Sequence, residues 1–266
     1  MAATSGQAEV NGTKLHYESA GRGPAVVFLN GGGLDSRMWD DQFAAFAELY
    51  RVIRYDYRGS GRSEPAQEKF SHLDDLAALL DILKVEAAVL IGASAGAALA
   101  LDYTLAHPQR VRGLVLVSPG LSGQQLSEAN QKRIEAMLAV AREGNAREFA
   151  KKVLDDPHFI PAAENPSARE KARQILIDNI ERFRAEDLAQ PPARPAAGRL
   201  AEIGAPALIL LGGRDHPEQL AVGEMLESGM RGAKTVVFFG SGHMVNLENP
   251  DRFNKTVLEF LAERGQ

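Results

Sequence analysis

Gly92-Ala93-Ser94-Ala95-Gly96 is the stretch of this sequence that decides the fold. It follows the apolar run 87–91 and precedes the small-residue segment 97–107, an order that predicts a strand, a sharp turn and a helix. A serine at the apex of such a turn sits in strained backbone with its hydroxyl aimed out of the sheet, while flanking glycines leave room that a side chain would block. The pattern therefore predicts Ser94 as a nucleophile.

A nucleophilic serine needs a base, and the chain offers six histidines. His243 follows the predicted strand 235–239 and the flexible Gly240-Ser241-Gly242, and it precedes a helix expected from Pro250. A histidine on a late loop at the carboxyl end of a strand is well placed to take the serine proton, so we predict His243 as the base. The other histidines occupy ordinary contexts in strands, at helix ends or near prolines: His16, His72, His107, His158 and His216.

The acid that orients the base is expected between the serine and the histidine in sequence, after a strand. The apolar run 207–211 leads into Gly212-Gly213-Arg214-Asp215, which makes Asp215 the candidate. An aspartate in a glycine turn is also a common turn former. His216 is its neighbour, but adjacent side chains in an extended loop point apart, so His243 is the better partner.

Three consecutive glycines follow the first buried strand predicted after the N-terminal hairpin. The strand 25–29 leads into Asn30-Gly31-Gly32-Gly33, and a helix is expected from about Met38. Glycines let backbone amides approach a ligand without an intervening side chain, as the developing negative charge of an acyl-transfer reaction requires. The run lacks the spaced lysine and hydroxyl of a phosphate-binding P-loop and the G-x-G-x-x-G spacing, so nucleotide binding is the weaker interpretation.

Two further segments point to a known family. Asp56-Tyr57-Arg58-Gly59-Ser60-Gly61-Arg62-Ser63 is similar to a D-x-R-G-x-G-x-S loop, and Gly240-Ser241-Gly242-His243 with Glu248-Asn249-Pro250 is similar to a closing G-x-G-H segment. With the order Ser94, Asp215, His243, these features resemble the α/β-hydrolase superfamily over nearly the whole chain. The resemblance implies a serine hydrolase whose oxyanion donors are the amides of Gly32 and Ala95, with Gly31 as a third candidate.

Asn30-Gly31 departs from the His-Gly pair of many members of that superfamily. With Met38-Trp39-Asp40 after it, the chain is similar to the carboxylesterase and 3-oxoadipate enol-lactonase-like branch. Ser94 argues against the haloalkane dehalogenase and epoxide hydrolase branches, which use a carboxylate nucleophile, and the absence of cysteine excludes the thiol-based dienelactone hydrolases. We expect Asn30 to support the loop by hydrogen-bonding the backbone of the glycines.

Composition limits the class of protein. The chain has 266 residues, 45% of them hydrophobic, a net charge of −5 and no cysteine. This size fits one α/β domain with an insertion, and the charge balance argues against a nucleic-acid partner. The sequence has no apolar run of membrane-spanning length, and residues 1–7 lack the features of a signal peptide, so we expect a cytoplasmic protein without membrane association. The lack of cysteine excludes a thiolate metal site, and the predicted serine chemistry needs no metal or cofactor.

Periodicity predicts an α/β fold with a doubly wound, mostly parallel sheet. Asn11-Gly12, between 9–10 and 13–18, predicts an N-terminal antiparallel hairpin. The apolar runs that read as parallel buried strands are 25–29, 52–55, 88–91, 114–117, 207–211 and 235–239, and helical patterns occupy 38–49, 73–83, 97–107 and 250–262. Ligands of such sheets bind at the carboxyl ends of the strands, where each predicted catalytic residue falls.

Residues 121–199 interrupt this alternation with helical patterns only. Ser127 opens one helix, and Asn145 with Glu148 and Ser167 with Glu170 predict caps for two more. The position between the strands at 114–117 and 207–211 favours a helical cap, or lid, over the active site rather than a surface decoration. We therefore expect an α/β-hydrolase core of residues 1–120 and 200–266 and a cap of residues 121–199.

The sequence as a whole predicts hydrolysis of a small or medium carboxylic ester or lactone through an acyl-enzyme. Carbon–carbon bond hydrolysis, perhydrolysis, acyl transfer and cofactor-free dioxygenation use the same constellation and stay open, as does a non-enzymatic ligand receptor on this scaffold. The identity of the small-molecule substrate depends on side chains that the cap brings to the pocket.

Overall fold

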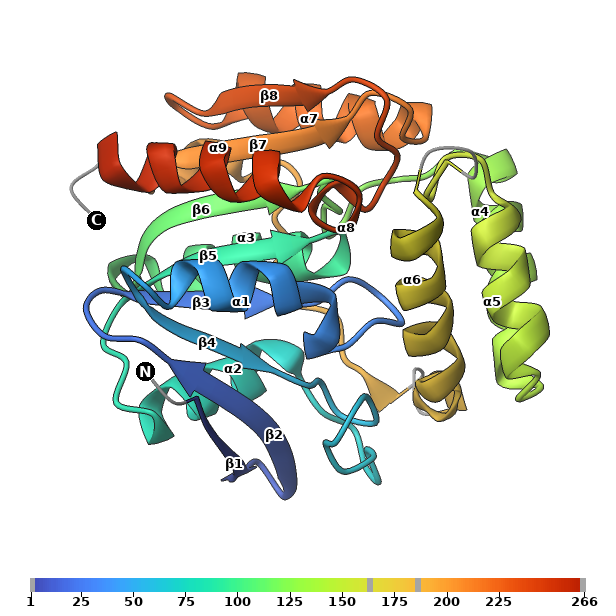
Figure 1. The fold of residues 1–266 in the computed structure, drawn as a ribbon, viewed down its shortest axis with the longest axis horizontal. Helices are drawn as coiled ribbons and strands as arrows, with labels where there is room; N and C mark the ends of the chain where they lie inside the picture. The colour runs from blue at the N-terminus through green and yellow to red at the C-terminus, as the bar shows by residue number, and fades with distance from the viewer. Residues whose placement is uncertain (1–2, 162–164, 185–187, 264–266) are drawn as a thin grey trace.

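A single twisted sheet runs through the computed structural model, which describes residues 3–161, 165–184 and 188–263 (Figure 1). The sheet has eight strands in the order β1-β2-β4-β3-β5-β6-β7-β8. The strands from β3 to β8 pair in parallel, while β1 and β2 pair antiparallel and β2 joins β4 antiparallel. The strand bounds are β1 Thr4–Val10, β2 Thr13–Ala20, β3 Ala25–Leu29, β4 Arg51–Tyr55, β5 Ala88–Ala93, β6 Val111–Val117, β7 Ala207–Gly212 and β8 Lys234–Phe238.

The N-terminal hairpin forms where the sequence predicts it. Asn11 and Gly12 connect β1 to β2 with positive φ angles of 42° and 75°, which are the angles that a two-residue type I′ turn requires. Val10 pairs with Thr13 across the turn. The predicted hairpin and the predicted mostly parallel sheet are both confirmed.

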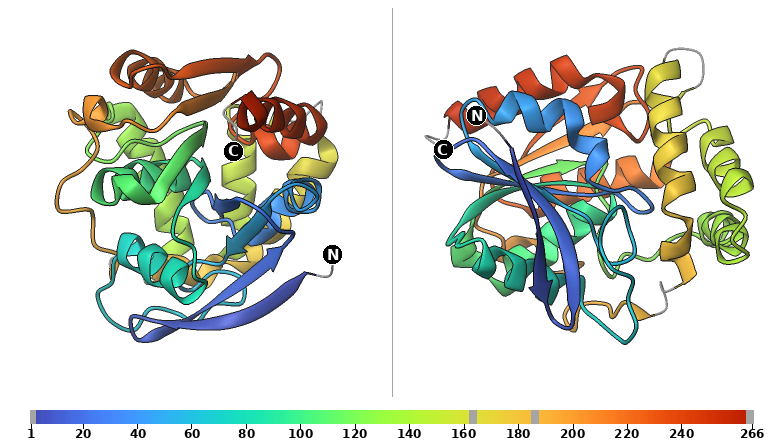
Figure 2. Two further views of the ribbon diagram at one scale, coloured as in Figure 1. Left: turned by 90° about the vertical axis from the view of Figure 1, so that its left-hand side faces the viewer. Right: turned by 60° about the horizontal axis from the view of Figure 1, so that its bottom comes forward.

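Helices cover both faces of the sheet (Figures 1 and 2). Two separate clusters of buried side chains result, and neighbouring strand residues alternate between them: Val26 and Phe28 belong to one cluster, Val27 and Leu29 to the other. Burial on both faces explains why these strands are continuous apolar runs. The helices are α1 Asp40–Phe46 and α9 Pro250–Glu263 on the first cluster, α2 His72–Ile82, α3 Ala95–Ala106 and α7 Pro217–Gly229 on the second, and the short α8 Val245–Glu248.

Short 3-10 turns connect several of these elements. They are η1 Ser36–Trp39, η2 Pro108–Arg110 and η5 Leu200–Glu202. The predicted helix 38–49 is therefore wrong in detail, because Asp35 caps η1 through the amide of Arg37 and α1 ends at Phe46. In the described ranges, none of the helices combines the length and the apolar character needed to cross a bilayer.

The helical insertion lies beyond the ends toward which the parallel strands point (Figures 1 and 2). It contains α4 Glu128–Arg142, α5 Ala146–Asp155, α6 Pro166–Asp178 and η3 Ile180–Arg184. Ser127 and Asn145 cap α4 and α5 as predicted. We propose the division that the sequence suggests, a core of residues 1–120 and 200–266 and a cap of residues 121–199.

The predicted start of the third cap helix is wrong. The helix begins at Pro166 rather than after Ser167, and Asn165 occupies the position before it without a side-chain capping bond. Proline suits the first helical position because its fixed φ is already helical and its missing N–H would have had no partner there. Ser167 and Glu170 are therefore the second and fifth residues of α6 instead of its cap pair.

Candidate active site

Ser94 lies in a strained turn between β5 and α3. Its backbone angles are φ 52° and ψ −112°, a conformation that residues other than glycine rarely adopt. A Cβ atom on Gly96 would lie 2.3 Å from the carbonyl oxygen of Leu29, and one on Gly92 would lie 2.3 Å from the carbonyl oxygen of Gly96. The two glycines therefore let α3 start against the end of β3, and the predicted strand, turn and helix are confirmed.

His243 and Asp215 are paired on adjacent loops. Asp215 follows β7 and His243 follows β8, and His243 Nδ1 lies 2.8 Å from Asp215 Oδ2 and 3.0 Å from Oδ1. The backbone amide of His216 donates to Asp215 Oδ1 at 2.7 Å, so His216 meets the carboxylate through its main chain. The sequence-based choice of His243 over His216 as the partner of Asp215 agrees with this geometry.

The electrostatics of this pair favour the protonated imidazole. Burial by itself lowers the pKa of His243, but the charge of Asp215 and its hydrogen bond outweigh burial, and the pKa of His243 is raised above its ordinary value. The histidine loop is also fixed from the cap, because the amide of His243 donates to the carbonyls of His158 at 2.9 Å and Phe159 at 2.8 Å. A base at this position is both oriented and made more basic.

Glu248 is a buried carboxylate behind the histidine loop, and sequence analysis assigned it no role. The amide of Gly242 donates to its two oxygens at 3.0 and 3.1 Å, and Asn165 Nδ2 donates from the cap at 3.2 Å. Burial raises the pKa of Glu248 to about 7. The signal in the sequence was a carboxylate only five residues after His243 and directly after Val245-Asn246-Leu247. This short spacing lets the side chain of Glu248 fold back onto the histidine loop.

The glycine loop after β3 faces the start of α3. Gly32 lines the same cavity as Ser94, and a Cβ on Gly32 would lie 3.9 Å from the Cβ of Ala95. Ala95 is the first residue of α3, where backbone amides have no acceptor within the helix and the helix dipole is positive. The amide of Gly31 instead donates to Met38 Sδ at 3.3 Å, which leaves Gly32 and Ala95 as the candidate oxyanion donors.

The predicted contact of Asn30 is corrected by the structure. Its side chain does not hold the backbone of the glycines; Nδ2 donates to the carbonyl oxygen of Tyr55 at 2.7 Å. Tyr55 ends β4, which lies parallel beside β3, so its carbonyl at the strand end is within reach of the residue that follows β3. The carbonyl of Asn30 accepts from the Tyr57 hydroxyl at 3.2 Å. Asn30 therefore joins two strand ends beneath the loop.

A cavity of about 320 Å³ opens above these groups and is lined by Gly32, Ser94, Asp215 and His243 together with residues of the cap. In the described part of the chain Ser94 and His243 share this cavity without a hydrogen bond between them; such catalytic contacts often tighten only in the substrate complex. The cap contributes an apolar wall that includes Met137, Leu138, Phe149, Val153, Leu176 and Phe183.

Polar side chains also line the cavity. His158 and His216, which sequence analysis took as ordinary, both line it with their rings 5.3 Å apart. Arg133 also lines the cavity, and its guanidinium is ion-paired with Asp156 and bonded to Asn130 Oδ1 at 2.9 Å. Within the described ranges, no three histidine, aspartate or glutamate side chains are grouped so as to hold a metal ion.

Comparison with known proteins agrees with this geometry. The model of the Alpha/beta hydrolase family matches residues 26–256, which is most of the chain. The chain belongs to this family. The match confirms the family recognition made from residues 56–63, 92–96 and 240–250, and it confirms the predicted fold.

Relatives of this α/β-hydrolase carry different chemical names. A 2-hydroxy-6-oxononadienedioate/2-hydroxy-6-oxononatrienedioate hydrolase of Burkholderia vietnamiensis is 34% identical, with 94% of this chain and 92% of the relative covered. The enol-lactonase from Burkholderia xenovorans LB400 is 28% identical with a TM-score of 0.84, covering 97% and 100% of the two chains. A thermophilic esterase from Thermogutta terrifontis is 25% identical with a TM-score of 0.84, covering 99% and 100%. The family establishes an enzyme of the α/β-hydrolase type, and the named relatives act on small molecules.

Proposed function

We propose that this α/β-hydrolase cleaves a small or medium carboxylic ester or lactone through an acyl-enzyme on Ser94. The observation that carries the proposal is the joint opening of Ser94 and the Asp215-paired His243 into one cavity with an apolar wall. A nucleophile, a base held by a carboxylate and fixed amide donors are the parts that acyl transfer requires.

The first half of the reaction acylates the serine. His243 takes the proton of Ser94 as Oγ bonds to the substrate carbonyl carbon, and the amides of Gly32 and Ala95 stabilise the resulting oxyanion. The intermediate collapses, the carbon–oxygen bond to the leaving alcohol breaks, and His243 returns its proton to that oxygen. In a lactone the leaving oxygen stays attached to the acyl group, because the bond that breaks is part of the ring.

The second half releases the acid. Water attacks the acyl carbon while His243 takes its proton, the same amides stabilise the second oxyanion, and Ser94 leaves with the proton from His243. Asp215 stays ionised and holds the imidazole in one orientation throughout. This use of His243 as a base requires its neutral form, so the raised pKa places the working range toward neutral and mildly alkaline pH.

The cavity wall favours a substrate whose acyl group is uncharged and apolar. The cap side chains Met137, Leu138 and Phe149 offer no hydrogen-bonding groups to a charged tail. Among the described residues that line the cavity, arginine and lysine are represented by Arg133, whose charge is balanced by Asp156. A free carboxylate on the acyl side would therefore be desolvated without a free cation to pair with it.

Carbon–carbon bond hydrolysis is the second candidate, and the name of the Burkholderia vietnamiensis relative favours it. That name describes a dicarboxylate with a 2-hydroxy and a 6-oxo group. The same serine, histidine and oxyanion donors could act on its ketone, but a carboxylate of such a substrate would need the Arg133–Asp156 pair to open. The two candidates thus differ in whether the substrate must be anionic.

A substrate panel separates these activities. Purified protein is assayed with p-nitrophenyl esters of increasing acyl length, with γ- and δ-lactones, and with a 2-hydroxy-6-oxo-dienoate, against a Ser94→Ala control. We expect turnover of neutral esters or lactones at least about 100-fold above that of the dienoate in kcat/KM, a difference of about 2.7 kcal/mol in transition-state stabilisation. The reverse ranking would replace ester cleavage by carbon–carbon cleavage, and no turnover of any substrate would favour the receptor alternative.

A further inference from the structure

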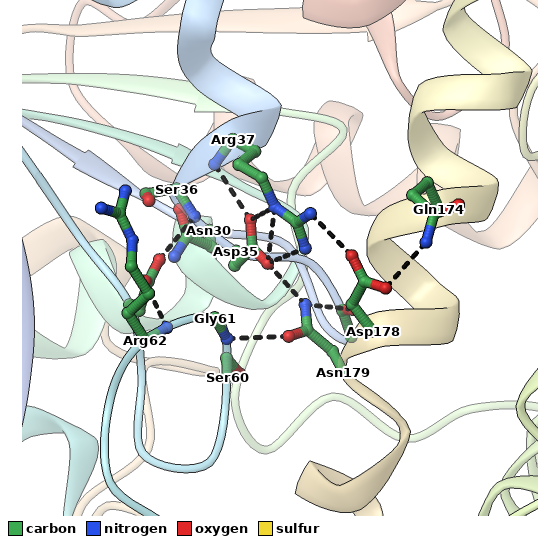
Figure 3. Close-up of polar contacts among 12 residues, drawn as sticks. Asn30, Asp35, Ser36, Arg37, Ser60, Gly61, Arg62, Gln174, Asp178 and Asn179 are labelled. Carbon is green, nitrogen blue, oxygen red and sulfur yellow. Dashed lines mark hydrogen bonds and ion pairs between the residues drawn. The ribbon is translucent and has the colours of Figure 1, made fainter.

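Asn179 is a buried cap residue whose side-chain nitrogen and oxygen both bond to the core (Figure 3). It follows the last residue of α6, and its Nδ2 donates to Asp35 Oδ2 at 3.0 Å and to the carbonyl oxygen of Gly33 at 3.3 Å. Its Oδ1 accepts from the amide of Gly61 at 2.8 Å. The side chain thus joins the cap to the glycine loop and to the loop 56–63, and each polar atom of its amide has a partner.

The contact with Gly33 is the first link of a chain of peptide groups. The carbonyl of Gly33 and the amide of Leu34 belong to one peptide unit, and that amide donates to the carbonyl of Gly31 at 3.2 Å. The carbonyl of Gly31 and the amide of Gly32 belong to the next unit in this chain. Asn179 is therefore connected, through two peptide units and one hydrogen bond between them, to the candidate oxyanion donor.

The direction of these bonds matters for an oxyanion hole. In a trans peptide the N–H and C=O groups point in opposite directions, so a bond made at the oxygen fixes where the N–H points. Bonds in such a series also polarise one another and strengthen the last donor. Gly33 makes the turn possible with φ +74°, and its α-carbon is packed against the cap, since a Cβ there would lie 3.0 Å from Phe183 Cζ.

We propose that Asn179 is a positioning residue that sets the direction and strength of the Gly32 amide in the oxyanion hole, and so makes the hole depend on the docked cap. The inference rests on the proposed function, because it needs an oxyanion at Gly32. Asn179 acts through the backbone and does not touch the substrate. The cap then has two roles, as the wall of the cavity and as the support of the catalytic donor.

A neighbouring contact provides a matched control. Arg37 joins the same two regions by ion pairs, to Asp178 Oδ2 at 2.7 Å from the cap and to Asp35 Oδ2 at 2.7 Å in the core. The side chains of Arg37 and Asp178 are each more than a third exposed, so their pair contributes little to stability. Asp178→Ala removes this cap-to-core ion pair. It leaves in place the hydrogen bonds that connect Asn179 to Gly32 through Gly33, Leu34 and Gly31.

The test compares Asn179→Ala, Asn179→Asp and Asp178→Ala with the wild type, each checked by a melting curve. With the best neutral ester, Asn179→Ala should lower kcat about tenfold with KM within about twofold, less than the 10²–10³-fold loss of a whole oxyanion donor. A trifluoromethyl ketone of the same acyl group should lose affinity by the factor by which kcat/KM falls. Asn179→Asp keeps the acceptor for Gly61 but lacks the donor to Gly33, and it places a second carboxylate beside Asp35 Oδ2, so its loss should be at least as large. Asp178→Ala should keep wild-type kcat.

Several results would overturn the inference. Unchanged kcat in Asn179→Ala, a rise in KM alone, wild-type kcat in Asn179→Asp, or an equal loss in Asp178→Ala would each show that Asn179 only fastens the cap. If Asn179→Ala does not fold, Asn179→Ser takes its place with the same expected loss. Failure of the proposed function is visible separately, because it appears as absent ester and lactone turnover in the wild type.

Discussion

The turn at Ser94 and the glycine loop after β3 face one another, yet they are held in different ways. The turn is fixed by its own backbone: the amide of Ser94 donates to the carbonyl of Val117 on β6, its carbonyl accepts from Gly120, and Gly96 packs directly on β3. The loop is held largely by side chains from elsewhere. Met38 Sδ accepts from Gly31, and Asn179 of the cap donates to Gly33.

The nucleophile is therefore positioned rigidly, while the oxyanion donors of the glycine loop can be adjusted. A nucleophile that is fixed by strand pairing and backbone packing keeps its place whatever the cap does. An oxyanion loop that depends on the side chains of Met38 and Asn179 responds to how those side chains pack, and Asn179 is distant from the loop in sequence. Changes at the turn should therefore be severe, and changes around the loop should be graded.

Ser94→Ala tests the fixed side of the comparison with the largest effect. Loss of the nucleophile should lower kcat by about 10⁶-fold at unchanged melting temperature, since the hydroxyl is absent and alanine fits the site. Steady-state kinetics on the best ester measure this. Ser118→Ala is the matched control, because Ser118 is a buried serine that follows Val117, whose carbonyl accepts from the Ser94 amide. A comparable loss there, or residual wild-type activity in Ser94→Ala, would contradict the assignment.

Asp215→Asn should lower kcat about 10⁴-fold while leaving the protein folded, because the imidazole loses its orienting charge.

In the wild type, kcat/KM should rise with pH through the pKa of His243 as the neutral base forms. The sequence alone predicts a midpoint at about pH 6 to 7, and the raised pKa moves the midpoint upward. In Asp215→Asn burial is no longer opposed, so the midpoint of the residual activity should move to lower pH. A midpoint that does not respond to the change would mean that another group controls the profile.

Gly96→Ala and Gly32→Ala compare the two regions directly by stability. The Cβ of Gly96→Ala would meet backbone at 2.3 Å, which should destabilise the fold by about 3 kcal/mol or more. The Cβ of Gly32→Ala would meet only the Cβ of Ala95 at 3.9 Å, an ordinary contact, so its melting temperature should stay at or slightly above that of the wild type. Calorimetry on both variants decides, and equal melting temperatures would remove the distinction between the regions.

Asn30→Ala should lower turnover by only about tenfold or less, because both oxyanion donors are backbone amides and remain. The variant leaves the carbonyl of Tyr55 without its buried donor, which should cost about 1–3 kcal/mol of stability. Kinetics and a melting curve on one sample measure both. Tyr57→Phe removes only the hydroxyl bond to the Asn30 carbonyl and serves as the control. A collapse of turnover without loss of stability would place Asn30 in contact with the reaction.

The turn and the strand ends could be predicted from sequence because their causes are local. Glycines beside Ser94, apolar runs and the Asn11-Gly12 pair each state a backbone requirement at the position where it acts. The same holds for the placement of Asp215 and His243 after strands, since parallel strands bring their carboxyl ends to one edge.

The support of the site could not be predicted, because it comes from long-range contacts. Asn179 lies 146 positions from Gly33, and nothing near residue 179 indicates that its amide meets the glycine loop. Asn30 was expected to bond the adjacent glycines, but its partner is on a neighbouring strand. Residues 162–164 and 185–187 of the predicted cap lie outside the described residues. Pairings of this kind depend on three-dimensional packing that no local pattern records.

The acyl-enzyme on Ser94 is tested most directly by mapping a covalent adduct. Wild-type protein is treated with a fluorophosphonate, and intact mass and peptide mapping locate the label, with Ser94→Ala and Ser118→Ala treated in parallel. We expect one label per chain, on Ser94, absent from Ser94→Ala and retained in Ser118→Ala. Among the described residues, Ser94 is the serine that lines the cavity with His243 and Gly32. Label on another serine, or labelling that persists in Ser94→Ala, would contradict an acyl-enzyme on Ser94.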